Sequence, residues 1–80
     1  MLSITKNEAQ QLRDKLLTLT AVHCGKEKDE YTIEFLHENG KVYFLRRLDG
    51  HPYTTNQLDT AKGLATGLDM VGFNVRLPRH

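Results

Sequence analysis

The chain has 80 residues, of which 39% are apolar and 26% are charged, and its formal net charge is +1. A chain of this length forms one domain with a thin core, because it buries only about 60–65% of the surface that its unfolded form exposes. The balanced charge argues against binding driven by bulk charge, either to nucleic acid or to a membrane. The single cysteine, Cys24, excludes an internal disulfide framework. The first residues lack the apolar stretch of a signal peptide, and no apolar run is long enough to span a bilayer. We therefore expect one α+β domain over residues 1–80, located in the cytoplasm.

The first predicted element is a helix over residues 6–19. Thr5 and Glu8 have the spacing of a capping box, in which the Thr5 hydroxyl accepts from the Glu8 amide and the Glu8 side chain reaches back. The β-branched residues Thr18, Thr20 and Val22 weaken a helix beyond residue 19, and the alternation over residues 21–24 predicts a short strand. The apolar residues that recur at helical spacing are Ala9, Leu12, Leu16 and Leu19.

Two segments rich in strand formers, residues 31–36 and 41–45, flank the dipeptide Asn39-Gly40. This dipeptide is preferred in two-residue turns whose central residues both need a positive φ. A two-residue loop would pair Leu36 with Tyr43 and Phe35 with Phe44, and the register decides which side chains share a face. The face that we expect to meet the core carries Tyr31, Ile33, Phe35, Val42, Phe44 and Leu48.

A second helix is predicted from a capping box at residues 54–57. It either stops at Gly67 or continues to a glycine cap at Gly72, and the contact that Leu68 and Phe73 would then make favours the longer helix. Gly63 and Gly67 interrupt this helix, and we expect them to let it lie close to the sheet. Residues 73–77 alternate in polarity and predict a last strand. The expected fold is α+β, with two helices packed on one face of a three- to four-stranded antiparallel sheet in the order α-β-β-β-α-β.

The residues that could carry chemistry do not form a recognisable catalytic or metal-binding pattern. The histidines and Cys24 lack the spacing of known metal sites, and Gly63–Gly67 lacks the pattern of a phosphate loop. Cys24 with a histidine base is the one nucleophilic arrangement available, and a single cysteine is more often a small packed residue. We therefore expect a non-enzymatic protein with no metal and no small-molecule cofactor.

The second face of the hairpin is the candidate binding surface. If both helices cover the first face, the second exposes a tyrosine and two leucines within a charged rim, which is typical of interaction patches. The predicted partner is a protein or a second copy of the chain. The function would be regulatory, that of an inhibitor or adaptor of the type that phages and mobile elements carry. The residues predicted to bind the partner are Leu36, Tyr43, Leu45, Arg47, Glu34 and Lys41.

Nucleic-acid binding is the alternative function, because charge is unevenly distributed along the chain. Residues 1–40 hold five Lys/Arg and seven Asp/Glu, whereas residues 41–80 hold six Lys/Arg and three Asp. A basic edge of the hairpin and the last strand could bind phosphates, although such side chains also serve to solvate a sheet edge. The residues of this predicted edge are Lys41, Arg46, Arg47, Arg76 and Arg79.

Overall fold

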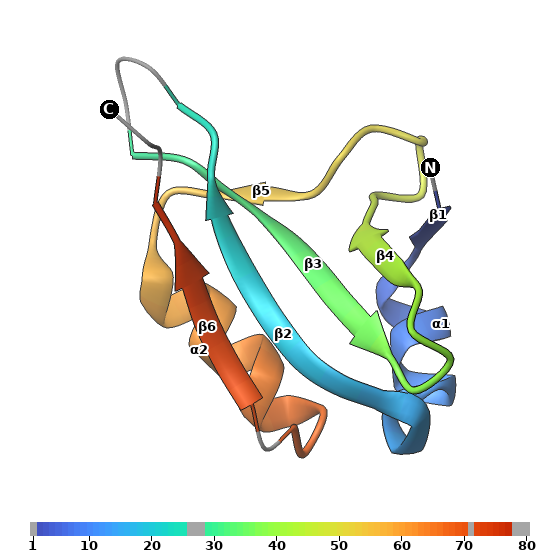
Figure 1. The fold of residues 1–80 in the computed structure, drawn as a ribbon. Helices are drawn as coiled ribbons and strands as arrows, with labels where there is room; N and C mark the ends of the chain where they lie inside the picture. Colours follow the sequence, from blue (N-terminus) through green and yellow to red (C-terminus); the bar gives the residue numbers. More distant parts are fainter. Residues whose placement is uncertain (1, 26–28, 71, 78–80) are drawn as a thin grey trace.

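A computed structural model describes residues 2–25, 29–70 and 72–77 of the chain. They form a curved sheet with two helices behind it (Figure 1). The elements in chain order are β1 (Leu2–Ile4), α1 (Lys6–Gln11), the 3-10 helix η1 (Arg13–Lys15), β2 (Leu16–His23), β3 (Tyr31–His37), β4 (Val42–Leu45), β5 (Thr54–Thr55), α2 (Leu58–Gly67) and β6 (Gly72–Arg76).

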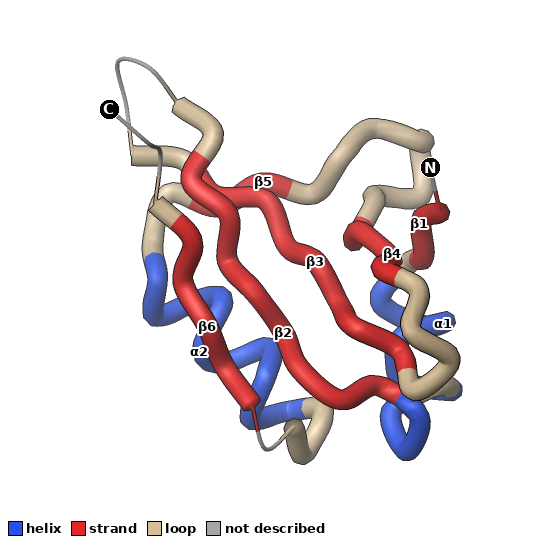
Figure 2. The backbone as a smooth tube through the Cα atoms, in the orientation of Figure 1, coloured by secondary structure: helices blue, strands red, loops and turns tan. Residues whose placement is uncertain are grey.

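The sheet is mixed and has six strands, in the order β1-β4-β3-β2-β6, with β5 paired to β3 beside β4 (Figure 2). The pairs β2–β3, β3–β4 and β3–β5 are antiparallel, whereas β1–β4 and β2–β6 are parallel. The predicted fold, two helices on a three- to four-stranded antiparallel sheet, is therefore wrong. Both ends of the chain add a parallel strand at a sheet edge, and α1 has only six residues against ten in α2.

The first helix begins as predicted but ends at Gln11, so the predicted extension to residue 19 is wrong. The capping box is confirmed: the Thr5 hydroxyl accepts from the Glu8 amide at 3.3 Å, and the Glu8 carboxylate accepts from the Thr5 amide at 3.0 Å. Leu16 and Leu19, which fitted a helical stripe, are both buried on β2. A bulge in β2 between Leu16 and Thr18 places two leucines three residues apart on the same face.

The turn between β3 and β4 lies where the sequence predicts it, but its loop has three residues, 38–40. The His37 amide donates to the Lys41 carbonyl, and the Gly40 amide donates to the His37 carbonyl, each at 2.9 Å. Gly40 has a φ of 85°, which is typical of a turn followed by a left-handed glycine. The predicted two-residue loop is therefore wrong.

The extra loop residue changes the register by one position. Phe35 pairs with Tyr43, and Leu36 pairs with Val42. Because side chains alternate along a strand, this shift moves every β4 side chain to the opposite face from the predicted one. Leu45 consequently lies in the core with only 1% of its surface exposed.

The core lies between one face of the sheet and the two helices. Its largest fully buried side chains come from the three central strands, while α1 contributes Ala9 and α2 contributes Ala61 and Ala65. These small helical residues bring the helix backbones close to the sheet. The opposite face of the sheet carries no helix in the part of the chain that the structure describes (Figure 1). The fully buried large side chains are Phe35, Leu19, Ile33 and Leu45.

The second helix differs from the favoured prediction at both ends, and its end at Gly67 is the alternative that the sequence left open. It begins after Gln57, whose side chain makes no capping hydrogen bond, and residues 54–55 form β5 instead of a cap. It ends at Gly67, and Gly72 belongs to β6. A Cβ atom added at Gly63 or Gly67 would meet nothing within 4 Å. The two glycines are therefore not required for close packing, contrary to expectation.

The end of α2 offers a test of backbone strain at Asp69, which has a φ of 56°. The Met70 amide donates to the Ala65 carbonyl at 3.0 Å, and the Asp69 amide donates to the Thr66 carbonyl at 3.1 Å. This pattern ends many helices with a left-handed glycine. We predict that Asp69→Gly raises the free energy of unfolding by about 0.5–1 kcal/mol, because a left-handed residue with a Cβ is strained.

Urea denaturation measures this change. The control is Asp59→Gly in the first turn of α2, where we expect a loss of about 0.5–1 kcal/mol, because the change removes a negative charge from the helix N-terminus and introduces a poorer helix former. Asp69→Gly also removes the exposed ion pair between Arg13 and Asp69, at 3.9 Å, and such a pair contributes little to the free energy of unfolding. An unchanged or lower stability of Asp69→Gly would contradict the prediction.

Candidate interaction surface

The face of the sheet opposite the core is the candidate site, and we call it the open face. Its members on the three central strands are directly cross-strand neighbours, so their side chains lie on the same side. The β-branched residues threonine and valine occupy most of it, as expected for a pleated surface that is half exposed. The residues of the open face on β2, β3 and β4 are Thr18, Thr20, Val22, Thr32, Glu34, Leu36, Val42 and Phe44.

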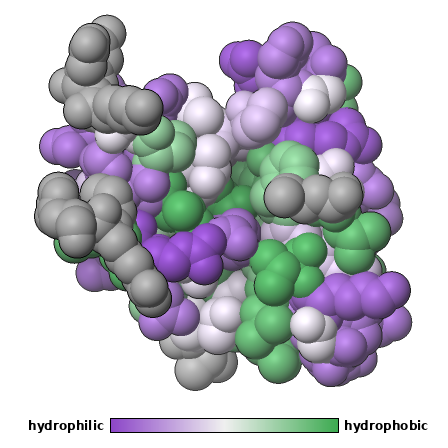
Figure 3. Space-filling view, turned by 45° about the horizontal axis from the view of Figure 1, so that its top comes forward, coloured by the Kyte–Doolittle hydropathy of each residue, from purple (hydrophilic) through white to green (hydrophobic). Residues whose placement is uncertain are grey.

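One part of the open face is apolar. Val42 pairs with Leu36 and is 47% exposed, and Phe44 follows two residues later on the same strand. A hollow of about 520 Å³ lies over these strands, and Figure 3 shows apolar surface within it. The residues that line the hollow are Thr32, Glu34, Val42, Phe44, Pro52 and Arg76.

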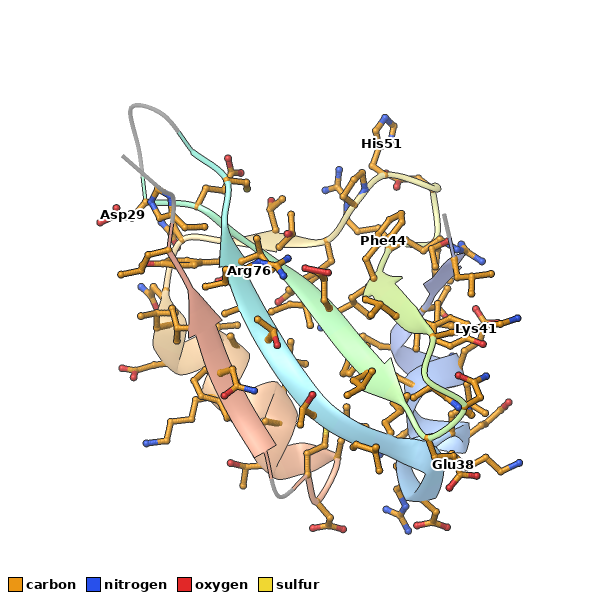
Figure 4. The ribbon with its side chains drawn as sticks, in the orientation of Figure 1. Asp29, Glu38, Lys41, Phe44, His51 and Arg76 are labelled. Carbon is orange, nitrogen blue, oxygen red and sulfur yellow. The ribbon has the colours of Figure 1, made fainter. Side chains whose placement is uncertain are left out.

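An ion pair lies beside this apolar surface. Arg76 extends from β6 across β2 and pairs with Glu34 on β3 (Figure 4). The Glu34 side chain is 25% exposed and that of Arg76 is 61% exposed, so the pair stays accessible from the hollow. The open face therefore presents apolar side chains next to one hydrogen-bond acceptor and one donor, with no net charge from the pair.

The predicted partner-binding residues are not brought together on one face. Glu34 and Leu36 lie on the open face, whereas Leu45 is buried and Tyr43 packs against the core. Lys41 is exposed at the end of the β3–β4 turn.

The sixth predicted residue, Arg47, lies beyond β4 in a loop. The sequence analysis missed Val42, Phe44 and Arg76 as neighbours on the exposed side. The length of the loop before β4 places Val42 and Phe44 there, and Asn39-Gly40 fits a two-residue as well as a three-residue loop.

The predicted basic edge is dispersed. Lys41 and Arg76 lie in separate parts of the molecule, and Arg76 pairs with Glu34 (Figure 4). Arg46 and Arg47 are adjacent in the loop after β4. Arg79 lies outside the described residues. The alternative of nucleic-acid binding stays a prediction, and the described part of the predicted edge does not form one basic surface.

Residues 46–52 form a second small hairpin, where the sequence Asp49-Gly50-His51-Pro52 predicts a turn but not the pairing on either side of it. Arg46 bridges to Pro52, and the Arg47 amide donates to the His51 carbonyl at 2.8 Å. Gly50 has a φ of 93°, so the turn resembles the one between β3 and β4. The His51 amide donates to Asp49, which lowers the pKa of the Asp49 carboxyl. The hairpin projects Leu48, which is 87% exposed.

Cys24 lacks the environment of a nucleophile. Partial desolvation and the negative charge of Glu30 raise the pKa of the Cys24 thiol, and its Sγ lies 3.5 Å from the Glu30 carbonyl. A reactive cysteine needs the opposite shift, because the thiolate is the attacking species. In residues 2–25, 29–70 and 72–77, no three metal-ligating side chains lie together as a metal site would require.

Comparisons of this chain with family models, with curated proteins and with solved structures find no match. Within the described part of the chain, neither helix is long and apolar enough to cross a membrane.

Proposed function

We propose that this protein is a non-enzymatic binding module whose open face takes an apolar, convex segment of another protein. The observation that carries the proposal is the hollow over Val42 and Phe44, which leaves apolar side chains accessible next to the Glu34–Arg76 pair. One face of the sheet is covered by helices, and a partner segment would cover the other in the same way. Such a module acts by binding its partner, without chemistry of its own, as inhibitors and adaptors do.

The apolar cluster supports a protein partner. Leu36 and Val42 are cross-strand neighbours, and Phe44 lies on the same face of β4. Exposed apolar residues scattered singly are normal, but a contiguous group beside polar side chains is typical of protein interfaces. Aromatic side chains and arginine contribute most to binding at such surfaces, and Phe44 and Arg76 both line the hollow.

The shape favours a different protein over a second copy. The open face is hollowed (Figure 3), so two copies that met with their hollows opposite each other would leave space between them. A helix, about 10 Å in diameter, or a hairpin would fill the hollow. Because Glu34 and Arg76 neutralise each other, the segment that fits has an apolar face and uncharged polar groups at its edge.

The test compares partner capture by three forms of the protein. The wild type, the double variant Val42→Ser with Phe44→Ser, and the control Leu48→Ser are each immobilised and exposed to lysate of the source cell. We predict that a protein retained by the wild type and by Leu48→Ser is lost from the double variant. Leu48 is the matched control because it is more exposed than Val42 but lies on the 46–52 hairpin.

Three further measurements separate the alternatives. Circular dichroism establishes that the double variant is folded. Sedimentation shows whether the retained protein is a second copy of the chain, and nuclease treatment shows whether nucleic acid bridges the contact. Capture that is equal for all three forms, or that depends on nucleic acid, would overturn the proposal.

A further inference from the structure

A second hollow, of about 360 Å³, lies between the start of α1 and the 46–52 hairpin. Three of its lining residues are cationic and none is acidic. The hollow on the open face instead contains the neutral Glu34–Arg76 pair, and another is lined by two acidic residues. The residues that line the second hollow are Thr5, Lys6, Asn7, Arg46, Arg47, Leu48 and Tyr53.

Two of the three cations are held in place by neighbours. Arg46 is 32% exposed, and its guanidinium donates to the Arg47 carbonyl at 3.4 Å and lies 3.5 Å from the Glu8 carboxylate. The Lys6 ammonium lies over the Tyr53 ring, 4.8 Å from its centroid. Side chains that are already positioned lose less conformational entropy when a ligand binds.

The two nearest carboxylates, those of Glu8 and Asp49, already accept hydrogen bonds from residues close to them in sequence. One oxygen of Glu8 accepts from the amide and the hydroxyl of Thr5, at 3.0 and 3.1 Å, and these bonds lower the pKa of Glu8. Asp49 accepts from the His51 amide and lies 3.7 Å from Arg47. Three cations and two carboxylates leave a local charge of +1, so the hollow favours an anion.

We propose that this hollow binds a phosphate group carried by a small molecule. Guanidinium groups form paired hydrogen bonds with phosphate oxygens, and an ammonium supplies a further positive charge. A long polyanion fits less well, because Lys41 and Arg76 lie elsewhere and do not extend the basic surface. The volume of the hollow falls within the range of small-molecule sites, about 300–1,000 Å³.

Titration followed by amide chemical shifts tests the site, with inorganic phosphate and pyrophosphate as probes. We expect saturable shifts confined to residues 5–7 and 46–53, stronger binding of pyrophosphate, and weakening at higher salt. In the double variant Lys6→Gln with Arg47→Gln, the affinity should fall about tenfold, since each exposed charge contributes a factor of up to about five. The control Lys62→Gln, an exposed lysine of α2, should bind as the wild type does.

Several outcomes would overturn the proposal. These are shifts that do not saturate, equal affinity in the double variant, or a single-stranded RNA oligonucleotide that binds this hollow far more tightly than pyrophosphate. The site is independent of the open face. The variant Val42→Ser with Phe44→Ser should therefore bind pyrophosphate normally, whatever it does to the protein partner.

Discussion

Replacing Leu45 with alanine should lower the free energy of unfolding by about 2–5 kcal/mol, the range for truncating a buried leucine. Leu45 is 1% exposed and packs in the core with Phe35. A domain of this length is stable by only about 4–12 kcal/mol, so the variant should be markedly less stable and could lose its fold at 37 °C. Urea denaturation at lower temperature measures the change.

Phe44→Ala is the matched comparison, because Phe44 precedes Leu45 on β4 but lies on the open face. It removes a larger side chain, yet it should cost less than half as much, since Phe44 is not part of the buried core. The two variants distinguish the two possible registers of the hairpin. A larger loss for Phe44→Ala than for Leu45→Ala would contradict the observed register.

The register could not be predicted because β4 is apolar on both faces. Its sequence, Val42-Tyr43-Phe44-Leu45, gives no alternation that would distinguish the core side from the open side. Asn39-Gly40 fits a two-residue loop and also the last two positions of a three-residue loop. The location of the turn was therefore predictable, but its length was not.

The places of the two edge strands, β1 and β6, could not be predicted from the sequence for a different reason. The strand β1 has three residues and owes its place to pairing with the distant strand β4. The strand β6 pairs in parallel with β2, which the leucine spacing assigned in part to a helix. The Glu34–Arg76 pair depends on this arrangement, so the open face could not be predicted in full. The capping box of α1 was predictable because Thr5 and Glu8 are local in sequence.

The contact between β2 and β6 makes a second strong prediction at Gly72, which pairs with Thr18. A Cβ atom at Gly72 would lie 2.6 Å from the Thr18 Cγ2 and 3.2 Å from its Cβ. We predict that Gly72→Ala lowers the free energy of unfolding by about 1–3 kcal/mol, as overpacking does. Because β6 carries Arg76, the displaced strand should also weaken the pair with Glu34 on the open face.

Thr18→Ser provides the test of this cause, because it removes the Cγ2 methyl that lies closest to the added atom. In the double variant with Gly72→Ala, part of the stability should return, with a coupling of about 1 kcal/mol in a double-mutant cycle. Gly63→Ala is the control for replacing a glycine where there is room for the added Cβ atom. Its added Cβ meets nothing within 4 Å, so it should stabilise α2 by about 0.5–1 kcal/mol. If Gly72→Ala lowers the free energy of unfolding by the same amount in the Thr18→Ser variant as in the wild type, then contact with the Thr18 side chain is not the cause of the loss.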